Sequence, residues 1–205
     1  MSAACIVPYA GRAALAADGR RLTVDEEIDP VVLSVVGIGN VLAGDDGAGV
    51  ELAEALERAG LPPGARVRQA GSDPLVVLEE LEAGRQVLLL DACRFGGKPG
   101  AMTWMRLDDP RWPAAASPLS LHGLDLPTVF QLARTLHLPL EKAWLLGVQP
   151  AATLGGRGLS PAVANAWPHL VDGAHRAVRR LLDGLAPADT APAPAAGGVA
   201  ASPGA

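Results

Sequence analysis

The chain has 205 residues, 49% of them hydrophobic, and a formal net charge of −5, which suits a single domain with a full core. The negative charge argues against nucleic-acid binding, which needs clustered Lys and Arg, and no apolar run approaches the roughly 20 residues of a membrane span. Its two cysteines are too few for a disulfide framework, and the first residues lack the continuous apolar stretch of a secretion signal, so we expect a cytoplasmic protein.

Strand and helix patterns alternate between residues 31 and 185, which we take as the folded domain. Strands are predicted at 31–36, 66–69, 87–90, 101–107 and 143–148, and helices at 47–59, 74–81, 126–136 and 160–182. The strand at 101–107 is expected to pair with the one at 87–90, and Pro168 to kink or split the last helix. This alternation predicts an α/β fold in three layers, with a mostly parallel, twisted sheet of about five strands and helices on both faces.

Both ends of the chain differ from this domain. Residues 1–30 show no sustained periodicity, and residues 186–205 are almost entirely Ala, Pro and Gly. The second composition buries too little apolar surface to offset the entropy of the chain. We expect both segments to be disordered extensions.

The loop between the first strand and the first helix is rich in glycine and ends in two aspartates, Asp45 and Asp46. It does not fit a dinucleotide-binding fingerprint, because Leu42 stands where the third glycine should be. Two adjacent carboxylates also repel a phosphate. The loop therefore indicates a cation site, and its glycines allow a sharp turn that brings the helix close to the sheet.

Three candidate ligands follow predicted strands, where open α/β sheets bind their ligands. Asp46 follows the first strand, Asp91 ends the third, and His122 lies between the fourth strand and the next helix. Each has a structural alternative. Asp45 or Asp46 can cap the first helix, Asp91 can cap a turn, and a histidine alone is more often an ordinary surface or core residue.

The remaining histidines and the cysteine near Asp91 receive the plainer interpretation. His137, His169 and His175 sit in or beside helical segments. Cys93 has no base close to it in the sequence, so we expect a small buried side chain rather than a nucleophile.

Five segments of the chain stand in a recognisable order. They are the loop at residues 37–49, then Leu88-Leu89-Leu90-Asp91-Ala92, Ser120-Leu121-His122, Gly147-Val148-Gln149-Pro150 and Gly158-Leu159-Ser160-Pro161. In this order, over about residues 33–182, the chain resembles the hydrogenase maturation endopeptidases. Members of that family remove a C-terminal peptide from the large subunit of nickel–iron hydrogenases.

The resemblance implies a nickel-sensing endopeptidase whose partner is the large-subunit precursor and which is a monomer before docking. Asp46, Asp91 and His122 would bind nickel that the precursor carries, with little nickel held by the free enzyme. Two carboxylates and an imidazole suit a first-row divalent metal.

Two chemical routes to cleavage remain open, and so do two other functions. The metal can activate a water or the scissile carbonyl, or an aspartate can act as general base, for which Asp45 is the candidate. The alternative functions are a metal-dependent hydrolase of a small substrate and a non-enzymatic protein that delivers nickel or docks on the hydrogenase.

Overall fold

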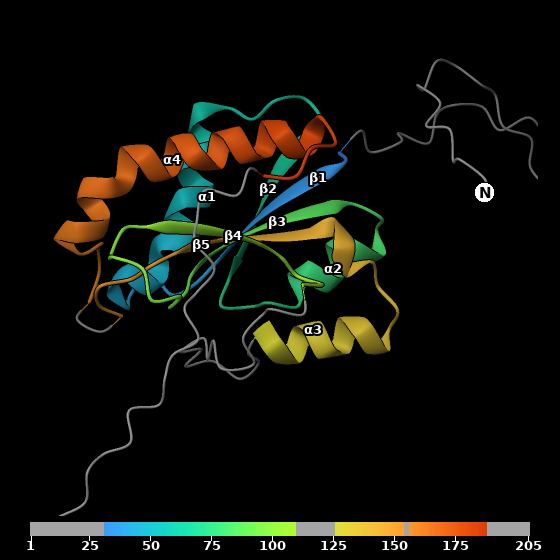
Figure 1. The fold of residues 1–205 in the computed structure, drawn as a ribbon, viewed down its shortest axis with the longest axis horizontal. Coiled ribbons are helices and arrows are strands. Elements are labelled where there is room, and N and C mark those ends of the chain that lie inside the picture. Colours follow the sequence, from blue (N-terminus) through green and yellow to red (C-terminus); the bar gives the residue numbers. More distant parts are fainter. Residues whose placement is uncertain (1–30, 110–125, 154–155, 188–205) are drawn as a thin grey trace, which may run out of the picture. The chain divides into compact units, whose positions relative to one another are not determined.

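A computed structural model describes residues 31–109, 126–153 and 156–187 of the chain (Figure 1). The elements in chain order are β1 (Leu33–Ile38), the 3-10 helix η1 (Gly44–Gly47), α1 (Ala48–Ala59), β2 (Ala65–Gly71), α2 (Val76–Glu82), β3 (Gln86–Ala92), β4 (Met102–Arg106), α3 (Leu126–Thr135), η2 (Leu140–Lys142), β5 (Ala143–Val148) and α4 (Pro161–Leu182). Every predicted strand and helix is present, with ends that shift by a few residues. The predicted extensions lie outside the described residues, apart from positions 186 and 187.

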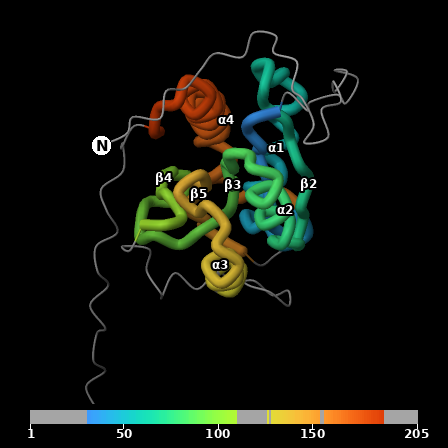
Figure 2. Tube along the Cα trace, turned by 90° about the vertical axis from the view of Figure 1, so that its right-hand side faces the viewer, coloured from blue at the N-terminus to red at the C-terminus, as the bar shows by residue number. Residues whose placement is uncertain are grey.

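The strands form one sheet in the order β2-β1-β3-β5-β4. β1 is parallel to β2 and β3, β5 is parallel to β3, and β4 alone runs antiparallel, against β5. Figures 1 and 2 show α1 and α4 on one face of the sheet and α2 and α3 on the other. The predicted three-layer α/β fold is confirmed.

Successive residues of the central strands serve two separate cores. On β1, Leu33 and Val35 pack with α1 and α4, whereas Val36 and Ile38 pack with α2 and α3. Side chains alternate between the faces of a strand, so a sheet covered on both faces needs strands that are apolar throughout. The apolar run at the start of the domain is therefore a central parallel strand.

The predicted pairing of β4 with β3 is wrong, because β5 lies between them. The connection between β3 and β4 bonds to β5 at both of its ends. The Cys93 N–H donates to the Val148 carbonyl, and the Gly100 N–H donates to the Gln149 carbonyl, each at 2.9 Å. This connection leaves room for a strand between its two ends, and β5 fills that room.

The sequence predicted that Pro168 kinks or splits the last helix, and the structure shows that it does not split it. α4 continues through it, from an N-cap at Ser160 whose side chain accepts a hydrogen bond from the Val163 N–H at 3.4 Å. Val163 and Leu170, on either side of the proline, are fully buried in the core. Packing on both sides holds the helix together despite the backbone hydrogen bond that proline cannot make.

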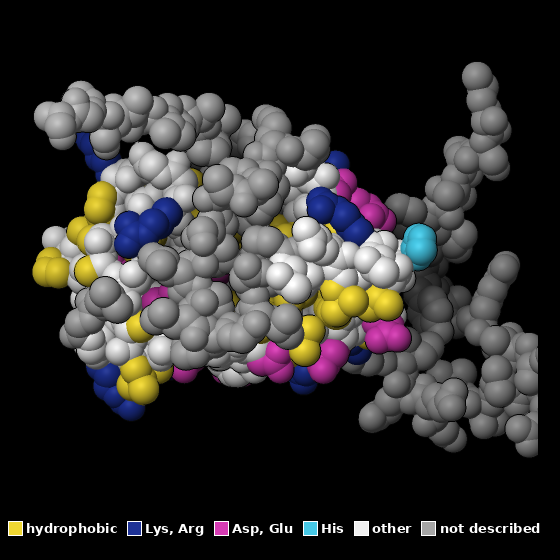
Figure 3. Space-filling model, turned by 90° about the horizontal axis from the view of Figure 1, so that it is seen from below, with side chains coloured by type: hydrophobic (Ala, Val, Ile, Leu, Met, Phe, Trp, Pro, Cys, Tyr) yellow, Lys and Arg dark blue, Asp and Glu magenta, His cyan; other side chains and the backbone are white. Residues whose placement is uncertain are grey.

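The face formed by α2 and α3 carries a small apolar surface. α3 buries Val129, Phe130 and Ala133, whereas Leu132 of α3 and Leu136, the residue after its end, are 39% and 55% exposed. Figure 3 shows hydrophobic side chains beside acidic and basic ones on this face. Among the described helices, none has the length and apolar character needed to cross a membrane.

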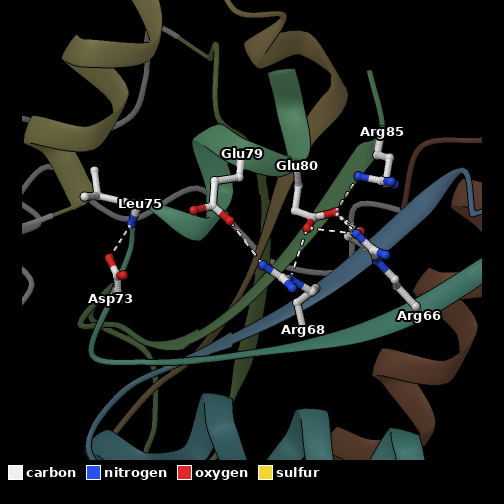
Figure 4. Close-up of polar contacts among 8 residues, drawn as sticks. Arg66, Arg68, Asp73, Leu75, Glu79, Glu80 and Arg85 are labelled. Atoms are coloured by element: carbon white, nitrogen blue, oxygen red, sulfur yellow. Dashed lines mark hydrogen bonds and ion pairs between the residues drawn. The ribbon is translucent and has the colours of Figure 1, made fainter. Parts of the chain in front are cut away.

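A buried carboxylate ties α2 to the sheet (Figure 4). Glu80 is 2% exposed and accepts hydrogen bonds from Ser34 of β1, from Arg66 of β2 at 3.0 Å and from Arg85 at 3.3 Å. Arg68 Nε forms an ion pair with it at 3.1 Å. Three guanidinium groups therefore converge on one carboxylate across two strands and a helix.

The charged form of Glu80 is favoured. Burial alone raises the pKa of this carboxyl, but hydrogen bonds from Ser34 and Arg66 and the charges of Arg66 and Arg85 outweigh it, so the pKa lies below its usual value. A group with a lowered folded-state pKa stabilises the fold above its unfolded-state pKa. That stability is lost as pH falls through the folded-state value.

Replacing Glu80 by glutamine should lower the free energy of unfolding by about 3 kcal/mol at pH 7, because it removes the charge of a 2% exposed carboxylate that three guanidinium groups, 17% to 41% exposed, share. The matched control is Glu79→Gln, since Glu79 pairs with Arg68 but is 64% exposed, and it should cost less than about 1 kcal/mol. Urea denaturation measures the free energy of unfolding of both variants. The difference in this free energy between wild type and Glu80→Gln should become smaller at acid pH. Equal losses for the two variants would contradict the assignment.

Candidate functional site

The loop between β1 and α1 lies tightly against the sheet at its glycines. Gly39 has a φ of +134°, and a Cβ there would lie 1.9 Å from the Asp46 carbonyl oxygen. At Gly49 a Cβ would lie 2.2 Å from the Leu90 carbonyl oxygen and 2.4 Å from that of Ile38. α1 therefore starts directly against the ends of β1 and β3, as the glycines predicted.

Asp45 is fully buried and bonds to a part of the chain more than a hundred residues further on. Its Oδ2 accepts hydrogen bonds from the backbone N–H groups of Ala151 at 2.8 Å and Ala152 at 3.0 Å. Its Oδ1 accepts one from the Ser160 N–H at 2.6 Å. One carboxylate thus fastens the loop after β1 to the connection between β5 and α4.

These contacts fix the charge state of Asp45. Burial raises the pKa of its carboxyl, but the hydrogen bonds from Ala152, Ser160 and Ala151 together outweigh it and hold the pKa below the usual value. The group is therefore an ionised carboxylate with backbone donors on both oxygens.

Neither aspartate of the loop caps α1, so that alternative is wrong. The N-cap of α1 is Gly47, and no side chain makes a capping hydrogen bond there. Asp46 instead reaches back across the loop, where its Oδ2 accepts a hydrogen bond from the Asn40 N–H at 2.9 Å. η1 intervenes between the aspartates and the helix, which moves both carboxylates off the capping position.

Asp46 and Asp91 interact where the carboxyl ends of the parallel strands meet, which we call the carboxyl edge of the sheet. Asp91 is 6% exposed, next to the last residue of β3 and opposite Gly147 of β5. Its pKa is raised well above the usual value, first by burial and then by the negative charge of Asp46, with only the Ala92 N–H opposing. The structure therefore brings two of the three predicted ligands into one electrostatic field.

His122, the third predicted ligand, lies outside the described residues. Within the described ranges, no group of three or more His, Cys, Asp or Glu side chains is placed to hold a metal ion. The two carboxylates have the chemistry of hard oxygen donors for a divalent cation.

Cys93 fills space rather than offering a nucleophile. A Cβ at Gly147 would lie 2.1 Å from its Sγ, so the missing side chain of that glycine makes the room for the thiol. Burial, and next the charge of Asp91, raise the pKa of the thiol. It remains protonated at neutral pH and is not a nucleophile, as expected, although the side chain is half-buried rather than buried.

Gln149 is a buried polar residue at this edge that was not singled out as a candidate. It is 7% exposed, and its Oε1 accepts hydrogen bonds from the backbone N–H groups of Phe95 at 2.9 Å and Gly97 at 3.2 Å. It thereby holds the loop that follows Asp91. The sequence pattern that could have identified Gln149 is the one used for Asp91, namely a polar residue directly after a predicted apolar strand.

Known proteins are similar to this chain in sequence. The family model described as hydrogenase maturation protease matches residues 50–177, more than half of the chain. The chain is 35% identical over 137 residues to the hydrogenase expression/formation protein HupD of Rhodobacter capsulatus, covering 66% of this chain and 65% of that protein. It is 32% identical over 140 residues to HupM of Azotobacter chroococcum, with 66% of each covered. The chain thus spans just under two thirds of the length of these relatives.

Solved structures share the same architecture. The hydrogenase maturating endopeptidase HybD from E. coli superposes with a TM-score of 0.56 at 26% identity, covering 73% of this chain and 93% of that one. The maturation protease HycI from Thermococcus kodakarensis gives 0.55 at 25% identity, covering 72% and 92%.

Asp45→Asn should lower the free energy of unfolding by about 2–3 kcal/mol, because an amide turns a donor toward backbone N–H groups that need an acceptor. Hydrogen exchange at Ala151, Ala152 and Ser160 should speed up in the variant. The gap in stability should narrow as pH falls and the wild-type carboxyl itself takes up a proton. Asp183→Asn, an exposed position at the end of α4, is the control and should change stability by less than about 0.5 kcal/mol. Unchanged exchange at the three amides would rule out the role given to Asp45.

Proposed function

Because the chain belongs to the hydrogenase maturation protease family, we propose that it is an endopeptidase that removes the C-terminal peptide of a nickel–iron hydrogenase large-subunit precursor. The observation that carries this proposal is the placement of two acidic residues at one edge of the sheet: Asp91 lies near the end of β3, and Asp46 lies in the loop that packs against the ends of β1 and β3. Ligands of open α/β folds bind at that edge. The segment 147–150 lies at the end of β5, and the segment 158–161 is tied to the same edge by the hydrogen bond from the Ser160 N–H to Asp45.

The proposed role of Asp46, Asp91 and His122 is to bind nickel that the precursor already carries. Two buried or half-buried carboxylates repel one another, and a divalent cation between them would relieve that repulsion. A cation would also displace the proton that Asp91 holds more readily than an ordinary aspartate. Coordination positions that these side chains leave open would be filled by the precursor's own ligands, so the free enzyme would keep little nickel.

Asp45 is proposed to position the loop rather than to take a proton. A general base works best when its pKa is near the working pH, whereas hydrogen bonds hold the pKa of Asp45 below its usual value. Its two oxygens already accept three backbone hydrogen bonds. This favours activation of the water or carbonyl by the metal over activation by Asp45.

The proposed setting is the cytoplasm, where the protein would be a monomer before it docks on the precursor. Two cysteines and an unpaired thiol at Cys93 suit a reducing compartment.

Asp46→Asn, Asp91→Asn and His122→Ala should each abolish shortening of a nickel-loaded precursor, because each removes a proposed ligand. Mass spectrometry of the large subunit measures shortening, and circular dichroism checks that each variant keeps its fold. His175→Ala and Asp183→Asn make the same chemical changes on α4 and its end, away from the proposed site, and should process normally. Normal processing by all three site variants would contradict the assignment of Asp46, Asp91 and His122 as nickel ligands. A wild-type protein that binds the precursor without shortening it would point to nickel delivery.

Removing nickel from the precursor should prevent cleavage by the wild-type protein, if binding of the metal precedes hydrolysis. The assay compares one precursor preparation before and after nickel is loaded, at equal enzyme concentration. Metal analysis of the purified enzyme should find little bound nickel. Efficient cleavage without nickel, or a stoichiometric ion in the free enzyme, would overturn the sensing role and favour a hydrolase with its own metal.

A further inference from the structure

A groove of about 450 Å³ lies between the edge strand β4 and helix α4. Met102 and Trp104 line it from the strand, and His169, Arg176 and Arg180 line it from the helix. The Met102 side chain packs onto α4 at Gly173, where a Cβ would lie 2.5 Å from the Met102 Cε. The groove is therefore a built feature of the contact between helix and sheet, with an apolar floor and a basic rim.

One end of the groove reaches the carboxyl edge of the sheet. Met102 pairs with Val148, the last residue of β5, and β5 is parallel to β3, which ends beside Asp91. From there the groove extends along β4 and α4 toward Arg180. A polypeptide lying in it would reach this edge of the sheet beside the end of β5.

The groove is basic in a chain whose net charge is −5. Arg176 pairs with Asp172 one turn earlier on the helix, but both side chains are more than half exposed, at 55% and 64%. Exposed ion pairs of this kind contribute little, so the guanidinium can exchange its partner for another carboxylate. Arg180 donates through Nε to the Ala186 carbonyl at 2.8 Å and keeps its other N–H groups.

The residue types also match those of protein interfaces. Trp, Met and Arg are enriched where proteins bind one another, and Trp and Arg contribute most of the binding energy. The whole chain has four tryptophans and three methionines, and one of each lies in this groove. A volume of this size accepts a few side chains of a peptide rather than a whole domain.

We propose that the groove between β4 and α4 docks an acidic segment of the hydrogenase large-subunit precursor, with an apolar side chain against Trp104 and carboxylates against Arg176 and Arg180. The proposal rests on the function proposed above, since it takes its partner from it. The groove then binds the substrate at a place separate from the carboxylates that meet the nickel.

The test compares Arg176→Glu with Arg179→Glu, the same charge reversal on the same helix at an exposed residue outside the groove. Processing of nickel-loaded precursor is followed over a range of precursor concentrations. Arg176→Glu should raise KM by about five- to tenfold with kcat within about twofold of wild type, because it repels the acidic segment without touching the catalytic edge. Arg179→Glu should match wild type. Added salt should raise the wild-type KM toward that of Arg176→Glu.

A direct binding measurement with the same precursor separates the two proposals. If wild type shortens the precursor and both charge reversals behave alike, the groove proposal is overturned and the protease proposal stands. If wild type binds the precursor but does not shorten it, the protease proposal fails. The groove proposal would still stand in that case if Arg176→Glu weakens binding of the precursor and Arg179→Glu does not.

Evidence that the groove holds something other than the precursor would also overturn the proposal. Deletion of residues 188–205 that lowers KM, with no effect of Arg176→Glu, would assign the groove to the chain's own C-terminal segment. A wild-type dimer that Arg176→Glu converts to monomer in sedimentation would assign it to a second copy.

Discussion

The buried Asp45 carboxylate is the contact on which the arrangement of the carboxyl edge depends. A charge without solvent must be met by hydrogen bonds, and here the donors are backbone N–H groups of Ala151, Ala152 and Ser160. These amides belong to the connection that leaves β5 and to the start of α4. The loop that carries Asp46 is thus fixed relative to the two elements that follow the last strand. Backbone hydrogen bonds from the Gly44 N–H to the Gly156 carbonyl at 2.7 Å and from the Asp45 N–H to the Ala152 carbonyl at 2.9 Å reinforce this attachment.

Two buried carboxylates of the fold lie in opposite electrostatic surroundings. Glu80 is surrounded by Arg66, Arg68 and Arg85, and its pKa is lowered. Asp91 meets the like charge of Asp46, and its pKa is raised. The first arrangement stabilises the sheet and α2. The second costs stability when both carboxylates are charged, and perturbed pairs of this kind are common at functional sites.

Local patterns in the sequence were enough to predict the elements, the layers and the role of the loop glycines, because each depends on neighbouring residues. They were not enough for strand order, since the partner of β4 lies beyond the long connection that includes α3. The role of Asp45 was equally hidden, because its partners lie 106 to 115 residues away. Asp45 and Asp46 are identical neighbours, and only the fold decides which one turns inward. His122 stays a prediction from the sequence.

In the proposed mechanism the groove binds the precursor and the carboxyl edge carries out the cleavage, and this separation affects specificity. An enzyme that bound its substrate only through the metal would have to hold it very tightly to act at low concentration. Binding energy from a remote segment removes that need, because contacts away from the reacting bond can bring the precursor to the site whether or not it carries nickel. The metal then matters in the step that follows binding. On this arrangement nickel would control kcat and the groove would control KM, so discrimination against an immature precursor would come from chemistry at Asp46 and Asp91 rather than from docking.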